Sequence, residues 1–508
     1  MELELNRTEL SGYDTIADTT LFSEETLECI VPDACPDILR ILDTDGVVCV
    51  KSKEAGEGRA ELRGMIRACV LYLPDGAEGI RTMEVSIPFT CGTDHPAIHT
   101  GCIVHAVPRL LSADARMLNP RKVYVRAEIA VGFQLFSPSA AMVSTSCDCQ
   151  ESWGIQEKRE RCQTYRIAAV QEKPFTFSDD LALPGSKPDL AELLRQRVDL
   201  SCTESKVIGN KLIFKGQAVL TLLYRTEDLM PVTVSFELPF SQIMEVSGAA
   251  EEADCDLELT LNDISCQPDP EDHRTISVSM GLLAQTVLRE EHSVEVVSDL
   301  YSTAYELTVE RQEDTFGRLS ERGSRRQSFR EILETSVAVK SVVDCSLAIG
   351  AVSQSWEGNL LTMSADTRVM ILYRGEDDEL YSLVRPVPVS CQWEPEAGCS
   401  CFCRCSCPGE FYATPTVGGI EVRFPLDFHY RAETRHTVLE AAAAHLDEER
   451  LCDSTQRPSI VLRMVEEGET LWDIAKAYAT TSADIIGANE LTEEAVPMGR
   501  LLLIPKKR

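Results

Sequence analysis

One local pattern occurs three times in this chain, and it constrains the fold more than any other feature. An apolar strand that closes on a tyrosine is found in RGMIRACVLYLPDG (63–76), KGQAVLTLLYRTED (215–228) and SADTRVMILYRGED (364–377). The tyrosines, Tyr72, Tyr224 and Tyr373, are 152 and 149 residues apart. A second apolar strand with a proline follows each of them, at Pro88, Pro239 and Pro388. Repeats this long indicate a series of homologous domains, because the units of a solenoid are shorter.

The segment upstream of the first two tyrosines predicts a short helix. The prolines and acidic residue of PDACPDILRIL and PGSKPDLAELL keep the same offset, with Pro32, Pro36 and Asp37 lying 152 residues before Pro184, Pro188 and Asp189. Proline suits the first helical position, and an acidic side chain in the first turn interacts favourably with the helix dipole. The third repeat keeps only SFREILE at this place. We therefore expect one short helix in each repeat.

Alternating apolar and polar residues predict a further strand downstream of each tyrosine, at 121–136, 274–288 and 419–432. Alternation with period two gives one buried and one wet face. The expected fold class is mainly β, with three tandem β-rich repeats at 10–160, 161–305 and 306–440. The polar, Ala-rich segment 441–458 is predicted to be a linker with a short helix. A smaller, separate domain is predicted at 459–508.

The last fifty residues predict a βααβ unit. A short strand, VLRMV, leads to a turn at Gly468, and Thr470 is a suitable N-cap for the helix LWDIAKAY. Apolar residues in that helix recur at helical spacing. A second helix is expected through ADIIGAN, followed by a loop with Pro497 and Gly499 and the strand LLLIP.

This unit resembles the LysM family in GETLWDIAKAY, NEL and GRLLLIP, with Glu469 where the family usually has Asp. The resemblance implies a shallow groove that binds N-acetylglucosamine polymers such as peptidoglycan, although some LysM domains bind proteins. By position, the groove would be lined by Gly468, Glu469, Thr470, Leu471, Trp472, Asn489, Val496, Pro497 and Met498. Two roles stay open for Trp472: its indole packs in the core, or it anchors a ligand on the binding face.

The repeats resemble the SPOCS domains of spore-forming bacteria, in the Pro-Asp motif, the strand ending Leu-Tyr and the later Pro-Phe strand. Several such domains followed by one LysM domain resemble the SipL family of clostridial spore-coat proteins. That resemblance implies a non-enzymatic scaffold in the mother-cell cytoplasm at the forespore surface and in the spore coat. It implies that the LysM domain binds the stage IV spore-coat morphogenetic ATPase. Other coat proteins or a second copy of the chain are further expected partners.

Composition narrows the alternatives. The 82 acidic and 49 basic residues give a net charge of −33, which disfavours nucleic acid and anionic membranes as partners. No export signal and no apolar run near 18 residues is found, so we expect neither export nor membrane insertion. No catalytic motif or cofactor-binding loop is recognisable, and we expect no enzyme activity and no cofactor. A peptidoglycan-binding protein, or a hydrolase carried by the LysM domain, remains the competing interpretation.

Two groups of residues could in principle bind a metal. CSCFCRCSC places Cys399, Cys401, Cys403, Cys405 and Cys407 at alternate positions, on one face if the segment is a strand. It follows the proline strand of repeat three as the alternating strand DCDLELTLNDISC (254–266) follows that of repeat two. We therefore expect a thiol-lined strand, with a metal site or oxidative cross-linking in an assembled coat as alternatives. The second group, His95, His99, Cys102 and His105, is expected to consist of ordinary loop and strand residues.

Overall fold

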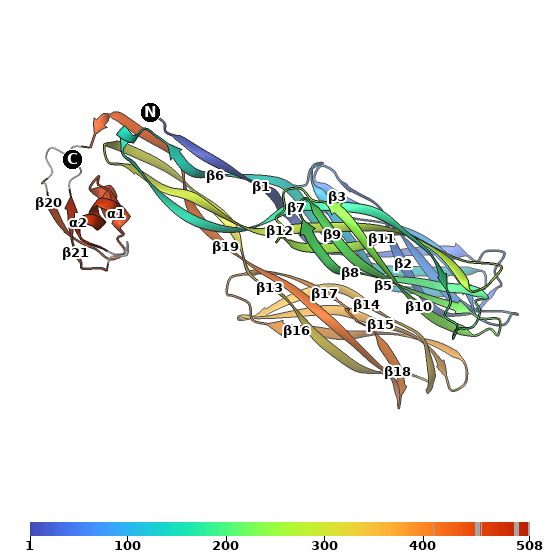
Figure 1. Cartoon of the computed structure of the whole chain (residues 1–508). Coiled ribbons are helices and arrows are strands. Elements are labelled where there is room, and N and C mark those ends of the chain that lie inside the picture. Colours follow the sequence, from blue (N-terminus) through green and yellow to red (C-terminus); the bar gives the residue numbers. More distant parts are fainter. Residues whose placement is uncertain (410, 453–457, 459, 492–496, 506–508) are drawn as a thin grey trace.

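The structure is a computed structural model that describes residues 1–409, 411–452, 458, 460–491 and 497–505. Strands make up nearly all of its regular structure, which confirms the mainly β fold class (Figure 1). No helix among the described residues is long and apolar enough to cross a bilayer.

Each repeat has the same strand order: a long outgoing strand, a three-stranded antiparallel meander, a further strand and a long return strand. In repeat three, two short strands, β17 and β18, take the place of the further strand. Repeat one contains β1 (Glu4–Ile30), β2 (Ile38–Ala55), β3 (Arg59–Pro74), β4 (Arg81–Asp94), β5 (Ile103–Asn119) and β6 (Lys122–Asp148). Repeat two contains β7 (Ile155–Ala182), β8 (Glu192–Ile208), β9 (Lys211–Arg225), β10 (Pro231–Glu245), β11 (Asp254–Pro268) and β12 (Thr275–Ser302). Repeat three contains β13 (Tyr305–Glu334), β14 (Val339–Glu357), β15 (Leu360–Gly375), β16 (Leu380–Trp393), β17 (Ser400–Ser406), β18 (Tyr412–Thr416) and β19 (Gly419–Leu451). A short 3-10 turn, Glu151–Trp153, joins the first two repeats.

The prediction of a short helix in each repeat is wrong: the described residues of the three repeats form no α-helix at these places. The Pro-Asp segments of repeats one and two form a turn that leads directly into β2 or β8, and SFREILE belongs to β13. Strand β2 pairs with β3 along its length, with register shifts after Ile38 and Ile41. These bulges break the period-two pattern, so the apolar residues acquire a spacing that looks helical. Pairing with β3 supplies the backbone hydrogen bonds, and this tertiary contact overrides the local preference.

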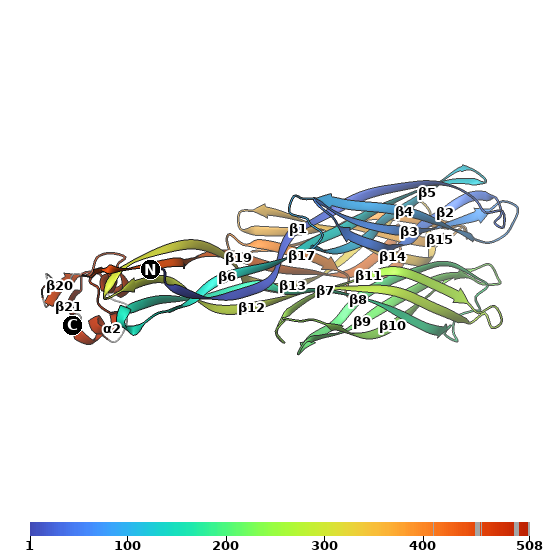
Figure 2. The same ribbon diagram turned by 90° about the horizontal axis from the view of Figure 1, so that it is seen from above.

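The long strands form three antiparallel pairs, one from each repeat: β1 with β6, β7 with β12, and β13 with β19. Figures 1 and 2 show these pairs continuing beyond the lobes as a twisted arm, with the C-terminal unit at its far end. Buried side chains from all six strands fill the arm, including Leu10, Val143, Cys162, Val296, Phe316 and Val438. The arm is therefore built jointly by the three repeats.

The prediction of a linker with a short helix at 441–458 is wrong for residues 441–451, which belong to strand β19. The described residues of 441–458 contain no helix. Residues up to Leu451 continue β19 into the arm, while 453–457 and 459 lie outside the described residues. Ala441 and Ala444 are fully buried between strand pairs. Small side chains let neighbouring backbones approach, so the Ala-rich composition reflects close strand packing here.

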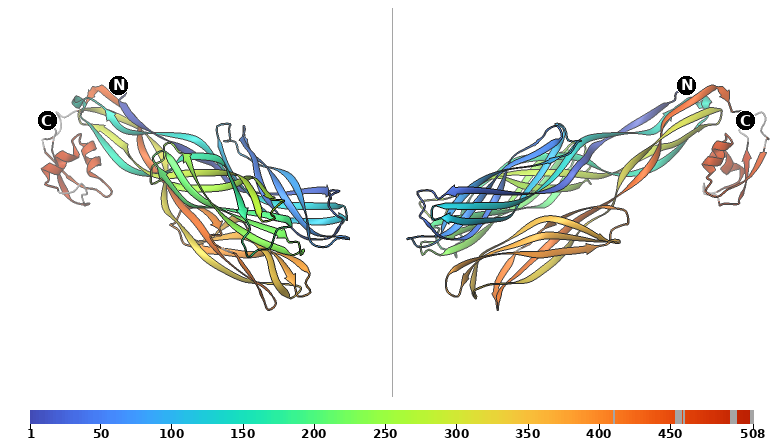
Figure 3. Two further views of the ribbon diagram at one scale, coloured as in Figure 1. Left: turned by 45° about the vertical axis from the view of Figure 1, so that its right-hand side comes forward. Right: turned by 180° about the vertical axis from the view of Figure 1, so that it is seen from behind.

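Figure 3 shows the three lobes packed beside one another. Each repeat has a large apolar core, and a smaller apolar cluster contains residues of all three repeats. The shared cluster contains residues from equivalent positions of the repeats. Leu71, Leu223 and Leu372 each lie one residue before the repeat tyrosine. The three lobes thus meet around a pseudo-threefold arrangement of equivalent strands.

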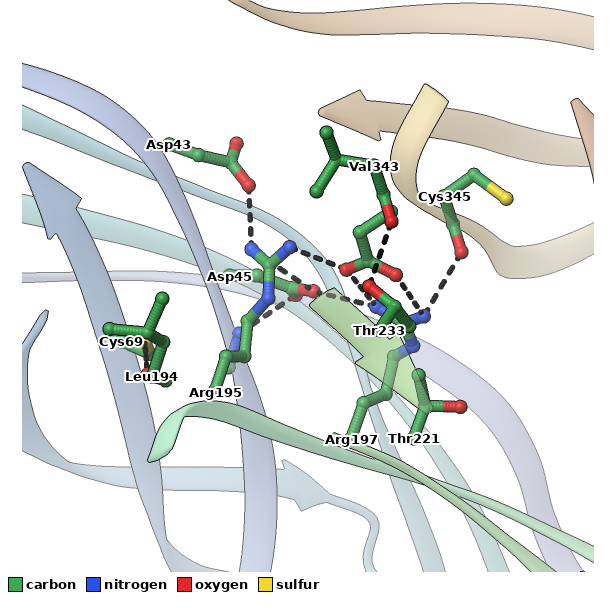
Figure 4. Close-up of polar contacts among 12 residues, drawn as sticks. Asp43, Asp45, Cys69, Leu194, Arg195, Arg197, Thr221, Thr233, Val343 and Cys345 are labelled. Atoms are coloured by element: carbon green, nitrogen blue, oxygen red, sulfur yellow. Dashed lines mark hydrogen bonds and ion pairs between the residues drawn. The ribbon is translucent and has the colours of Figure 1, made fainter. Parts of the chain in front are cut away.

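A buried cluster of charges lies beside this apolar cluster, and we call it the junction cluster: Asp43, Asp45, Arg195, Arg197 and Asp344. Arg195 of β8 donates one hydrogen bond to Asp43 of β2 and another to Asp344 of β14, each of 2.6 Å. Figure 4 shows the Arg195 guanidinium facing Asp43. Burial alone would raise the pKa of Asp344, but the two arginines lower it to about 2. Burial also raises the pKa of Asp43, and its contact with Arg195 offsets only part of that rise. The buried hydrogen bonds of Arg195 therefore join all three repeats, and Asp344 is the carboxylate that the arginines hold ionised.

Candidate binding site in the C-terminal unit

The C-terminal unit has the predicted βααβ order. It consists of β20 (Ile460–Met464), α1 (Leu471–Ala477), α2 (Ser482–Ala488) and β21 (Leu501–Pro505), with β20 and β21 antiparallel. Thr470 caps α1 in a reciprocal capping box with Asp473, and Thr481 caps α2. Leu471, Ile474, Ile485, Leu502 and Ile504 form its core. These local signals explain why this part of the fold could be read from the sequence.

Two loops of the predicted groove lie side by side. The Val465 amide donates to the Arg500 carbonyl at 3.0 Å, and the Gly499 amide donates to the Val465 carbonyl at 2.9 Å. These bonds continue the pairing of β20 with β21, so the turn with Gly468, Glu469 and Thr470 and the loop with Pro497 and Met498 begin at the same end of this strand pair. Gly468 has φ of 78°, a left-handed conformation that favours glycine. Met498 is 70% exposed, so the two loops offer a shallow, accessible surface.

Acidic side chains slightly outnumber basic ones on this surface. Glu466 and Glu467 are exposed beside the turn, Arg463 pairs with Glu466 at 3.3 Å and with Glu469 at 2.7 Å, and Arg500 is exposed on the facing loop. The small excess of negative charge disfavours anionic polymers and favours a neutral or basic ligand surface. The loops offer backbone groups and an apolar methionine, which can bind and orient a ligand.

Three predicted groove residues have other positions. Leu471 is buried in the core of the unit. Asn489 fastens α2 to β21, because its side chain donates to the Leu503 carbonyl and accepts from the Leu503 amide, both at 2.7 Å. Trp472 lies on α1, and its indole nitrogen donates to Asp299 of β12 at 2.8 Å. Val496 falls outside the described residues.

Sequence reasoning missed the arm residues that contact this unit. Asp299 and Tyr301 of β12 precede Trp472 by 173 and 171 residues, and Tyr301 joins the apolar core of the C-terminal unit. No local motif marks a contact across such a separation. The one available signal was the row of apolar residues around them at the end of an alternating strand.

The middle of the cysteine run forms β17, as predicted, with Cys399 and Cys407 next to its two ends, and β17 occupies the same place in repeat three as β11 in repeat two. Its five cysteines all pack against the core of that repeat. Burial raises the pKa of Cys403 and of Cys405 to about 12. The five cysteines of the run are free thiols. These sulfurs therefore line the inner face of a sheet.

The histidine group does not converge. His99 shares a hydrogen bond with Ser137 at 3.0 Å, whereas His105 is buried with its ring edge-on to Phe136. Burial lowers the pKa of His105 to about 3, which keeps its imidazole neutral. Across the part of the chain that the structure describes, no three His, Cys, Asp or Glu side chains gather as a metal site.

Two family models match parts of the chain. The model of the SipL SPOCS domain matches residues 37–118 and 189–269, which span β2 to β5 and β8 to β11. The LysM model matches residues 464–505. No curated protein and no solved structure matches the chain. Repeat three lies outside the matched segments but has the same strand order.

Proposed function

The chain has a SipL-like architecture, with SPOCS domains followed by a C-terminal LysM domain, and from this premise we propose that it is a scaffold for spore-coat assembly. Both are non-catalytic domain families, and together they fit a sporulation protein. In the proposed role the chain works without catalysis, in the mother-cell cytoplasm at the forespore surface and later in the coat. Its LysM domain binds the stage IV spore-coat morphogenetic ATPase.

The observation that carries this proposal is the position of the LysM domain in the fold. The domain sits at the far end of an arm made by strands of all three repeats, away from the lobes (Figures 1 and 2). The lobes in turn are joined by the junction cluster and by a shared apolar cluster. A body of this kind holds a recognition domain at a fixed distance from its other contact surfaces, which is what a scaffold requires.

Surface chemistry supports a protein ligand. The groove loops carry a small excess of acidic side chains, and the chain as a whole has a net charge of −33. Wall polymers with anionic substituents are repelled by such a surface, whereas a protein can present a neutral or basic patch. Met498 is a suitable apolar contact for such a partner, because methionine adapts its shape to different surfaces.

Copurification tests the proposal. The full chain and a chain that lacks the LysM domain are each expressed in the sporulating host and captured with a common tag. The coat ATPase is expected to copurify with the full chain and to be lost with the shortened chain. Undiminished recovery of the ATPase with the shortened chain would refute binding through LysM.

Peptidoglycan binding is the second candidate, and the match to the LysM model favours it. The turn with Gly468, Glu469 and Thr470 fits the family pattern of the glycan groove. Sedimentation with insoluble peptidoglycan separates the two candidates. Saturable binding that soluble muropeptides compete away would support a wall ligand, and its absence alongside ATPase capture would support the scaffold.

A further inference from the structure

The outer face of α1 lies against the end of β12, at the tip of the arm. Trp472 donates its indole N–H to an Asp299 carboxylate oxygen at 2.8 Å. One helical turn later, the Lys476 ammonium lies 2.7 Å and 2.8 Å from the two oxygens of the same carboxylate. Residues four apart share one face of a helix, so a single acidic side chain engages this whole face.

Asp299 is well suited to hold that face. Its side chain is only 10% exposed, and a buried carboxylate is costly unless its oxygens accept hydrogen bonds. Two of its donors, Trp472 and Lys476, come from the LysM domain, while Arg311 of β13 lies 2.5 Å away on the arm. Removal of the LysM domain from this position would strip the carboxylate of two donors. Such charge-assisted hydrogen bonds are among the stronger polar contacts in proteins.

Tyr301, two residues further along β12, adds an apolar contact. Its ring meets the Trp472 ring edge to face, with the centroids 4.7 Å apart, and its hydroxyl donates to the Thr480 carbonyl at 2.8 Å. Tyr301 is 4% exposed and belongs to the same apolar cluster as Ile474 and Ile485 of the LysM domain. The small core of the LysM domain is thus completed by a side chain of the arm.

We propose that Asp299 and Tyr301 are positioning residues that dock the LysM domain on the arm, and that Trp472 serves this internal interface. The docked contact uses the indole N–H and one ring edge, which leaves the two groove loops as the accessible part of the domain. The orientation of the groove relative to the three lobes is therefore set by the arm. This inference is independent of which ligand the groove binds.

The test follows the indole N–H signals of the full chain by NMR after selective ¹⁵N labelling of tryptophan. The chain has four tryptophans, and Trp472→Phe identifies the signal of Trp472. In the native chain, solvent exchange of this proton is expected to be slowed about tenfold or more relative to Asp299→Ala, because the contact with Asp299 protects it. The other three indole signals report whether the variant is folded.

Glu295→Gln is the matched control, since Glu295 is an exposed carboxylate on the same strand. It is expected to leave the Trp472 signal unchanged. Lys476→Ala, on the surface of α1, gives a second perturbation that leaves the strands intact, and it is expected to speed the exchange. Equal exchange of the Trp472 proton in the native chain, Asp299→Ala and Lys476→Ala would overturn the docked arrangement.

Discussion

Arg195 is the residue on which the union of the three repeats depends most, and Arg195→Leu tests that dependence. The substitution puts an apolar side chain in the junction and removes the more closely paired of two guanidinium groups, Arg195 and Arg197, that join β2 to β14. Asp43 then loses its ion pair with Arg195, and Asp344 keeps its ion pair with Arg197. The three side chains involved are only 5%, 11% and 4% exposed, for Arg195, Asp43 and Asp344. Water therefore cannot replace the lost contacts.

The expected cost is large. Removal of one partner from a buried ion pair typically destabilises a protein by about 3–5 kcal/mol, because the remaining charge stays buried without compensation. Whole domains are stable by about 5–15 kcal/mol, so a loss of this size is a substantial fraction of the total. Arg195→Leu combined with Asp43→Leu removes the stranded charge as well. This double variant is expected to recover at least about half of the lost stability.

Equilibrium unfolding in urea, followed by circular dichroism at pH 7, measures these differences. Arg59→Leu is the matched control, because Arg59 pairs with Glu61 and Asp94 on the surface with its side chain 48% exposed. Its unfolding midpoint is expected to match that of the native chain. If Arg195→Leu unfolds at the same urea concentration as the control, the junction cluster does not hold the repeats together.

Three further predictions concern other parts of the chain. Thr470→Ala removes the cap of α1, which costs about 1 kcal/mol, and amide exchange in α1 should quicken by about fivefold, whereas Thr470→Ser should preserve it. Since burial raises the pKa of Cys403 and Cys405 to about 12, alkylation by iodoacetamide at pH 8 should be about a thousandfold faster in urea than in the folded chain; equal rates would contradict their burial. Although burial alone would raise the pKa of Asp256, neighbouring arginines lower it to about 2, so its contribution to stability is complete above about pH 4 and is lost as the pH falls toward 2. In Asp256→Asn, the unfolding midpoint should depend less on pH over this range than it does in the native chain. The same pH dependence in both chains would count against the ion pairs of Asp256.

The sequence predicted those features that depend on local pattern. The similar spacing of Tyr72, Tyr224 and Tyr373, 152 and 149 residues, located the central strands β3, β9 and β15. Cap and turn residues located both helices of the LysM domain. Alternation correctly placed the cysteine run on a strand with its sulfurs on one face, because a strand has no other periodicity.

The predictions of secondary structure were wrong where pairing with a distant strand decides the conformation. The apolar spacing of Ile38, Ile41 and Leu42 looks helical, yet it arises from bulges in a strand that pairs with β3. Similarly, Ala441 and Ala444 favour a helix by propensity but lie buried in an extended arm. In both places, backbone pairing with distant residues outweighs a preference of a few tenths of a kcal/mol per residue.

One contact between the repeats has a recognisable pattern in the sequence. Asp43, Arg195 and Asp344 occupy equivalent positions at the offsets of the tyrosines, and each follows a register shift in its strand. Opposite charges at equivalent positions are a signature of homologous units that meet one another. The docking of Trp472 on Asp299 has no such repeat signal, and it became visible only with the fold.

Binding of the purified coat ATPase to the purified full chain tests the central claim most directly. Met498→Asp places a charge on the exposed groove loop, and Met117→Asp is the matched control on β5, where the methionine is 43% exposed. The account predicts saturable binding that weakens about tenfold or more with Met498→Asp and is unchanged with Met117→Asp. Equal dissociation constants for the native chain and both variants would contradict the claim that the groove of the LysM domain recognises the ATPase.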